Sequence, residues 1–165
     1  MEPSLKSARK TGRWWTSARR CSCWGNAMNK EEIMKILPHR DAMLLVDQAS
    51  VKDGVARGSY RVRGDEWFLQ GHFPGNPVVP GVVLCEMLAQ AACVLMADGL
   101  KGNETPYFTG LNNVRFRSMV RPGDLFESEC VITKSKGMFY FASGKGSVGG
   151  KTCVTGDFSF ALIRG

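Results

Sequence analysis

The sequence predicts an α+β fold in which an antiparallel sheet wraps around one long apolar helix. Two features of the 165-residue chain lead to this fold class. Residues 78–97 are apolar in nearly every helical direction, as in a helix that is buried on all sides. Alternating runs of apolar and polar residues precede and follow this stretch, with Gly-rich separators typical of an antiparallel sheet. Because such a helix needs a cover, the sheet should pack around it.

The first element should be a short amphipathic helix over residues 29–36. Asn29 provides an N-cap, and Glu32, three residues later, completes the pattern of a capping box. The helix should end before Pro38, because a residue that precedes proline is pushed out of the helical conformation.

A β-hairpin is expected next. Residues 43–50 and 55–62 look like its strands, and Asp53-Gly54 between them supplies the positive φ angles of a tight turn. One helical turn is expected at residues 65–68. The central helix should then end near residues 98–99. The remaining expected strands are residues 107–116, 125–135, 138–148 and 152–163.

A loop rich in glycine and proline, residues 71–81, carries His72 directly before the central helix. Its three prolines and three glycines restrict the backbone while they permit sharp bends. Pro80 suits the first helical position, and Gly81 would let a ligand approach the free amides of the first turn, as in an oxyanion site. The loop alone is equally compatible with a turn-rich connection and a solvent-facing histidine.

Glu86 and Gln90 are the polar exceptions in the central helix, and they lie four residues apart on one face. The other positions predict a helix whose apolar residues are buried, with only these two side chains at its surface. Since glutamate is rarely buried without a partner, Glu86 should point into a polar cavity or face an interface. The alternative is that this face of the helix is open to water.

Composition indicates one globular domain preceded by a basic extension. The chain has 44% hydrophobic residues, enough for a sizeable core, and the apolar stretch is too interrupted to span a membrane. Residues 1–27 hold six basic residues and one acidic residue, which is +5 of the net charge of +7. Residues 28–165 therefore form the predicted domain, and the charge of the extension does not make that domain a nucleic-acid binder.

The extension, residues 1–27, is expected to be poorly ordered. An early start or an added expression segment is the first interpretation, and an organelle transit peptide, of plastid type, is the second. The six cysteines show no paired spacing of a zinc site or of a disulfide framework, which favours a reducing compartment and a cytoplasmic location.

Several motifs together resemble the FabZ type of 3-hydroxyacyl-[acyl-carrier-protein] dehydratase of bacterial fatty acid synthesis. The central one is the loop GHFPGNPVVPG at residues 71–81, followed by Glu86 and by Ala89-Gln90. The likeness extends to ILPHR and LLVD upstream, and to NVRFR and VRPGD downstream. It covers residues 28–163 in order and at the family's spacing.

The resemblance implies a hot-dog fold, in which a curved antiparallel sheet wraps around the long helix. It also implies dimers whose sheets pair edge to edge, with three dimers commonly forming a hexamer. In such dimers His72 of one subunit meets Glu86 of its partner. A continuous motif would then serve two active sites.

The implied reaction is the loss of water from a (3R)-3-hydroxyacyl thioester of acyl carrier protein, without a metal or an organic cofactor. Neutral His72 would remove the proton next to the thioester carbonyl. Glu86 would help the 3-hydroxyl to leave, either through a bound water or as a protonated acid, for which burial must raise its pKa. The amides of Gly81 and Val82 would bind the thioester oxygen, and Gln90 could orient Glu86.

Three basic residues, Arg115, Arg117 and Arg121, could steer an acidic carrier protein to the mouth of a substrate tunnel. They could equally be solvated charges at the ends of strands. His39 matches a structural stretch of the family pattern, and nothing near it in the sequence suggests a base held beside an acid.

Other functions stay open at this point. A hot-dog thioesterase needs a water-activating carboxylate at another place. An isomerase-dehydratase tends to carry aspartate where Glu86 stands. A non-enzymatic acyl-thioester sensor would not need the His72 and Glu86 pair.

Overall fold

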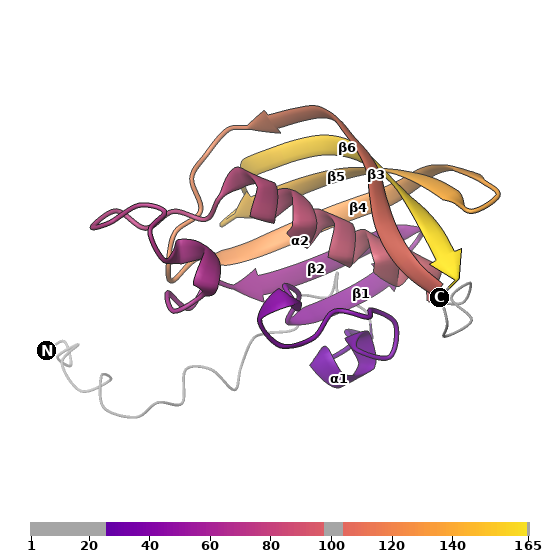
Figure 1. Cartoon of the computed structure of the whole chain (residues 1–165), viewed down its shortest axis with the longest axis horizontal. Helices are drawn as coiled ribbons and strands as arrows, with labels where there is room; N and C mark the ends of the chain where they lie inside the picture. Colours follow the sequence, from indigo (N-terminus) through magenta and orange to yellow (C-terminus); the bar gives the residue numbers. More distant parts are fainter. Residues whose placement is uncertain (1–25, 98–103, 165) are drawn as a thin grey trace, which may run out of the picture.

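A single curved sheet and one long helix dominate the computed structural model, which describes residues 26–97 and 104–164. The strands are β1 (Gln48–Lys52), β2 (Val55–Arg61), β3 (Glu104–Phe116), β4 (Leu125–Lys136), β5 (Phe139–Val148) and β6 (Lys151–Arg164). They form one antiparallel sheet in the order β1-β2-β4-β5-β6-β3. Helix α2 (Gly81–Cys93) lies across its concave side (Figure 1). The predicted fold class, with a sheet wrapped around one helix, is confirmed.

The first helix, α1, is shorter than predicted and spans only Lys30–Ile33. Its capping box is confirmed: the amide of Glu32 donates to Asn29 Oδ1 at 3.0 Å, and the amide of Asn29 donates to Glu32 Oε2 at 2.8 Å. Isolated turns follow, and they place Leu37 in the core.

The hairpin of β1 and β2 is present, but its first strand begins five residues later than predicted. Asp53 and Gly54 form the turn with φ angles of 53° and 74°, as expected. The segment before β1 contains the 3-10 helix η1 (Asp41–Met43) and then a buried loop, because the amide of Leu45 bonds to a side chain of α2 instead of a strand. The predicted helical turn at 65–68 is η2 (Trp67–Leu69).

Helix α2 begins one position later than the sequence suggested. Pro80 is its N-cap, not its first helical residue, and Gly81 takes that place. Ten of the thirteen helical residues are buried, so the prediction of an almost fully buried helix is correct. Val82 is an exception, since 68% of it is exposed. A 3-10 turn, η3 (Val94–Met96), continues the helix, and the expected end at residues 98–99 lies outside the described residues.

Small residues let the helix approach the sheet. A Cβ atom added to Gly58 of β2 would lie 2.9 Å from the Cβ of Ala91 in α2 and 2.8 Å from Ser128 Oγ in β4. Glycine at this position therefore sets the distance between the two layers.

The sheet has two edges, β1 and β3. In the described residues, no strand pairs with the outer side of β3 (Figure 1). Several of its large apolar side chains are exposed, namely Tyr107, Phe108, Leu111 and Phe116. An apolar edge of this kind is a template for pairing with another chain.

The expectations for the basic extension reach beyond the described residues. The basic extension, residues 1–27, falls almost wholly there, so its expected disorder and its origin stay predictions. Within residues 26–97 and 104–164, no helix has the length and apolar character needed to cross a membrane.

Candidate active site

The loop before α2 holds His72 in one orientation. Its ring Nδ1 lies 2.8 Å from the carbonyl oxygen of Val78, and its amide donates to the carbonyl oxygen of Leu69 at 3.2 Å. Because a carbonyl oxygen only accepts hydrogen bonds, Nδ1 must carry the proton. In neutral His72 the lone pair is therefore on Nε2, and this nitrogen can act as a base.

Contacts along the rest of the loop keep it close to the β3–β4 connection. The amide of Val79 donates to the carbonyl oxygen of Val120 at 2.8 Å, and Arg121 Nη1 donates to Asn76 Oδ1 at 2.6 Å. The ring of Phe73 stacks on that of His72, with the centroids 4.1 Å apart. The loop is turn-rich, as in the alternative interpretation, but the His72 ring is only partly exposed and is held by a hydrogen bond.

The first turn of α2 presents free amides, as the sequence suggested. Among the hydrogen bonds of the described residues, none uses the N–H of Gly81 or of Val82, whereas the next amide, of Val83, donates to the carbonyl oxygen of Pro80. A Cβ atom on Gly81 would lie 2.7 Å from the ring of Phe116. Glycine therefore allows the edge strand β3 to come close to this helix end.

Glu86 lies one and a half turns further along α2 and is tied down through a single oxygen. Its Oε1 accepts a hydrogen bond from Gln90 Nε2 at 2.8 Å, so the two residues are in contact, and the orienting role of Gln90 stays a prediction. The same oxygen lies 3.3 Å from Nε2 of His39. Because both contacts are made by Oε1, the other carboxylate oxygen, Oε2, has no partner among the described residues.

Hydrogen bonds at both ends of its side-chain amide fix Gln90. It is only 1% exposed, so the expectation that it breaks the helix surface is wrong. Its Oε1 accepts from the amide of Leu45, and its Nε2 also donates to the carbonyl oxygen of Met43, each at 2.8 Å. These bonds to the loop before β1 decide which end of the amide faces Glu86.

The pKa of Glu86 lies below its ordinary value. Burial raises it, but the hydrogen bonds from His39 and Gln90 lower it by more, with the charge of protonated His39 acting in the same direction. The raised pKa that a protonated acid would require is therefore not found in the single chain.

His39 is the site residue that the sequence did not reveal. It stands 47 positions before Glu86, and the expectation that nothing near it suggests a base beside an acid is wrong. No spacing rule joins a loop residue to a helix residue so far along the chain. The only available signal was that His39 is one of two histidines.

His72 and Glu86 do not touch within the described chain: no hydrogen bond or ion pair between residues 26–97 and 104–164 joins them. His72 stands in front of α2, whereas Glu86 faces His39 in the loop between α1 and η1. Near the first turn of α2 the surface exposes Val82 and, next to Gly81, the ring of Phe116. One chain therefore carries two separate parts of a possible site.

The three arginines proposed for carrier docking differ in their surroundings. Arg115 and Arg117 are exposed at and just beyond the end of β3. Arg121 is half-buried and engaged with Asn76 and with Met119 Sδ, so it supports the His72 loop as well.

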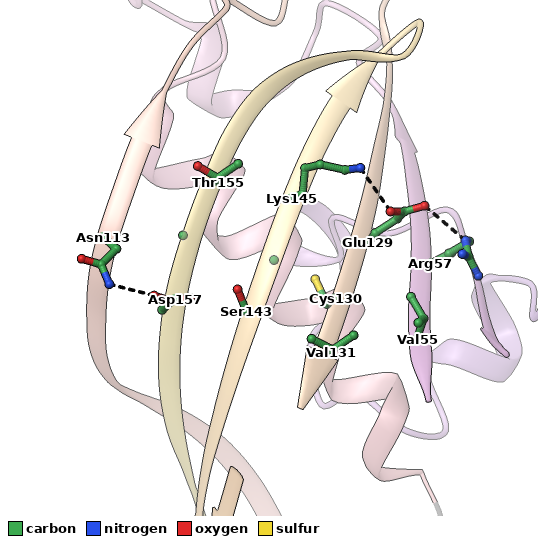
Figure 2. Close-up of a pocket in the computed structure, with 12 residues that line it drawn as sticks. Val55, Arg57, Asn113, Glu129, Cys130, Val131, Ser143, Lys145, Thr155 and Asp157 are labelled. Carbon is green, nitrogen blue, oxygen red and sulfur yellow. Dashed lines mark hydrogen bonds and ion pairs between the residues drawn. The ribbon is translucent and has the colours of Figure 1, made fainter. Parts of the chain in front are cut away.

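A hollow of about 520 Å³ lies elsewhere, on the sheet (Figure 2). Its charged side chains are engaged with their neighbours: Glu129 pairs with Arg57 at 3.4 Å and with Lys145 at 3.3 Å, and Asn113 donates a hydrogen bond to Asp157 at 2.8 Å. It contains none of the predicted site residues, so it is not the candidate active site.

A sheet wrapped around one helix, with His72 before the helix and Glu86 within it, defines a hot-dog protein of the dehydratase class. The model of the FabA-like domain matches residues 37–157. The 3-hydroxyacyl-[acyl-carrier-protein] dehydratase FabZ of Clostridium beijerinckii is 42% identical over 141 residues, which are 82% of this chain and 99% of that protein. The FabZ of Oenococcus oeni is 41% identical, with 82% and 99% covered. The chain belongs to the FabA-like family and, within it, to the FabZ dehydratases.

Solved structures agree on the fold. The dehydratase heterocomplex ApeI:P from Xenorhabdus doucetiae matches with a TM-score of 0.71 at 22% identity, over 80% of this chain and 91% of that one. A probable thioesterase from Bartonella henselae matches with a TM-score of 0.54 at 17% identity, over 68% and 92%. At these identities the likeness concerns the scaffold only.

Proposed function

We propose that this chain is a hydro-lyase that converts (3R)-3-hydroxyacyl-[acyl-carrier-protein] to the trans-2-enoyl product in fatty acid elongation. Its FabZ relatives, more than 40% identical along nearly their whole length, carry the name of this activity. The single observation that carries the catalytic assignment is the fixed tautomer of His72, which points a basic Nε2 away from the Val78 carbonyl.

In the proposed reaction, His72 Nε2 takes the proton from the carbon next to the thioester carbonyl. The amides of Gly81 and Val82 donate to the carbonyl oxygen as negative charge builds up there. Both amides lie at the positive end of the α2 dipole. In other enzymes, removal of one such donor lowers the rate by roughly 10²- to 10³-fold.

Glu86 assists the departure of the 3-hydroxyl as an ionised carboxylate. Because the pKa of Glu86 is lowered, its carboxylate has no proton to give to the hydroxyl. The route through a bound water is therefore favoured over the route through a protonated acid. The bond from carbon to the hydroxyl oxygen breaks, and the proton held by His72 passes through this water to the leaving oxygen. One water is released, and both side chains return to their starting state.

The catalytic pair comes from two subunits in this proposal. Within the described chain Glu86 meets His39 and Gln90, not His72. A dimer that pairs the free outer side of β3 with its copy would bring a second chain to this apolar edge. Three such dimers would form the expected hexamer.

The substrate partner is an acyl carrier protein, and Arg115 and Arg117 are the exposed cations suited to meet its acidic surface. Arg121 contributes there and also holds Asn76. We assign the protein to the cytoplasm, since Cys85, Cys93, Cys130 and Cys153 are free and buried thiols, as suits a reducing compartment.

The test supplies a (3R)-3-hydroxyacyl carrier-protein thioester to the full chain and follows the enoyl product by its absorbance. His72→Ala and Glu86→Gln should each lower kcat by at least about 10²-fold, while the exposed change Asp65→Asn should not. Absence of product from the wild-type chain at every acyl length would refute the enzymatic assignment. Retained activity in either variant would remove that residue from the mechanism.

Mixing the two inactive variants tests the shared site. After subunit exchange, half of the dimers should be mixed and each should hold one intact site, so about a quarter of the wild-type activity should return. If exchange is verified by mass and no activity returns, each site is built from one chain.

A further inference from the structure

His39 occupies a position that the proposed reaction leaves unexplained. Its Nε2 lies 3.3 Å from Glu86 Oε1, and only 23% of its side chain is exposed. The neighbouring Arg40 fastens this segment, since it donates to the carbonyl oxygens of Met34, Leu37 and His39 itself. The imidazole is therefore held against the carboxylate by a braced loop.

We propose that His39 is a positioning residue: its Nε2–H and Gln90 Nε2 together hold Glu86 Oε1, so that Oε2 is the oxygen presented to the 3-hydroxyl or its water. This inference rests on the proposed function, because it concerns how the same carboxylate is prepared. His39 itself touches neither the substrate nor the reacting atoms in this arrangement.

The two donors reach Glu86 from different elements. Gln90 belongs to α2, as Glu86 does, and its amide is fixed by Met43 and Leu45. His39 comes from the loop between α1 and η1. If Gln90 were the only donor, the carboxylate of Glu86 could still turn about that one hydrogen bond. A second donor on the same oxygen fixes the plane of the carboxylate.

The contacts of His39 identify the ring nitrogen that donates to Glu86. Nε2 must carry a proton to donate to Oε1. Its Nδ1 is buried and has no hydrogen-bond partner in the described part of the chain. The donor that meets Glu86 Oε1 is therefore the Nε2–H of His39.

The other groups around Glu86 do not replace His39. Gln90 is neutral, and the thiol of Cys93 has its pKa raised to about 12 by burial and, further, by the charge of Glu86, so it stays protonated. Among the described residues, His39 is thus the one titratable donor in contact with the carboxylate. Without it, burial acts against fewer opposing hydrogen bonds, and the pKa of Glu86 should rise.

The experiment compares His39→Ala with His39→Gln in the full chain. The glutamine amide can place a nitrogen donor near the position of Nε2, whereas alanine cannot. His39→Ala should lower kcat about 10- to 100-fold with a smaller change in KM, and His39→Gln should restore most of that loss. Equal defects in both variants, or wild-type kcat in His39→Ala, would overturn the proposal.

A second measurement does not depend on turnover. The side-chain carboxyl signal of Glu86 can be followed by carbon-13 NMR during a pH titration and identified by its loss in Glu86→Gln. The titration midpoint should move upward in His39→Ala and stay near the wild-type position in His39→Gln. An unchanged midpoint in His39→Ala refutes the role of His39 even if the enzyme proves inactive, whereas failure of the proposed function would appear as wild-type turnover in His72→Ala or Glu86→Gln.

Discussion

Asp47, immediately before β1, shows how one carboxylate can join three segments. Lys30 of α1 lies 3.1 Å from its Oδ1, Arg63 donates to the same oxygen at 2.7 Å, and the amide of Arg61 donates to Oδ2 at 2.8 Å. Burial raises the pKa of Asp47, but these donors lower it by more, so the net shift is downward. An ionised Asp47 therefore stabilises the folded state.

The sign of this linkage leads to a prediction on pH. Because the folded pKa lies below the ordinary value of 3.8, the stabilisation is present above pH 3.8 and is lost as the pH falls through the folded pKa. Asp47→Asn should lower the free energy of unfolding at pH 7 by about 1 to 3 kcal/mol. Urea denaturation should show a smaller difference at pH 3.5. The exposed Asp65→Asn should change neither value, and an Asp47→Asn effect that is equal at both pH values would contradict this account.

Residue-scale prediction from sequence worked where the partners are close along the chain. Asn29 and Glu32 form their capping box, and Gln90 reaches Glu86 one helical turn away. The contact between His39 and Glu86 could not be inferred, since it depends on how a loop packs against a helix. The charge state of Glu86 depends on that contact as well.

Among the elements, β1 shows why an apolar run can be misread. Residues 43–50 look like a strand, yet Leu44, Leu45 and Val46 are buried in a loop. The amide of Leu45 finds its acceptor in Gln90, so this backbone needs no neighbouring strand. The later strands have alternating patterns, with two-residue turns between β4, β5 and β6, and their predicted bounds agree with the structure to within a few residues.

The contact between α2 and β2 yields a prediction about packing. Gly58→Ala would place a methyl group 2.9 Å from Ala91 Cβ and 2.8 Å from Ser128 Oγ, so the helix must shift. Unfolding in urea should show a loss of about 1 to 3 kcal/mol. Thr155→Ala, at a half-buried position of β6 in the same sheet, serves as the matched control. Equal stability of the two variants would show that the layers have room for a side chain at Gly58.

For the whole molecule, the free edge at β3 is the feature that bears on assembly. Its exposed aromatic and aliphatic side chains are unusual for a surface strand, which is commonly protected by charge. The same edge adjoins the first turn of α2 through Phe116 and Gly81. A substitution that prevents pairing at this edge should therefore also lower the activity.

Leu111→Lys tests this link. A charge in the middle of β3 should shift the protein from dimers, or larger assemblies, to monomers in sedimentation experiments, because buried unpaired charge is unfavourable at an interface. Activity should fall in parallel and recover in part at high protein concentration. Val51→Lys on the opposite edge strand, at a similarly exposed position, should leave both properties unchanged. Monomers with full activity would contradict a site shared between chains.

Local sequence patterns were sufficient to predict the class of fold and to single out His72 and Glu86 as candidate residues. Periodicity and turn residues act over short distances, so the helix, the hairpin turn and the strands could be inferred from local patterns, and the loop around His72 marked the family. The partners of Glu86, the burial of Gln90 and the separation of His72 from Glu86 within one chain became apparent only in the folded molecule. These depend on contacts between residues far apart along the chain, and such contacts form only when the sheet closes around the helix.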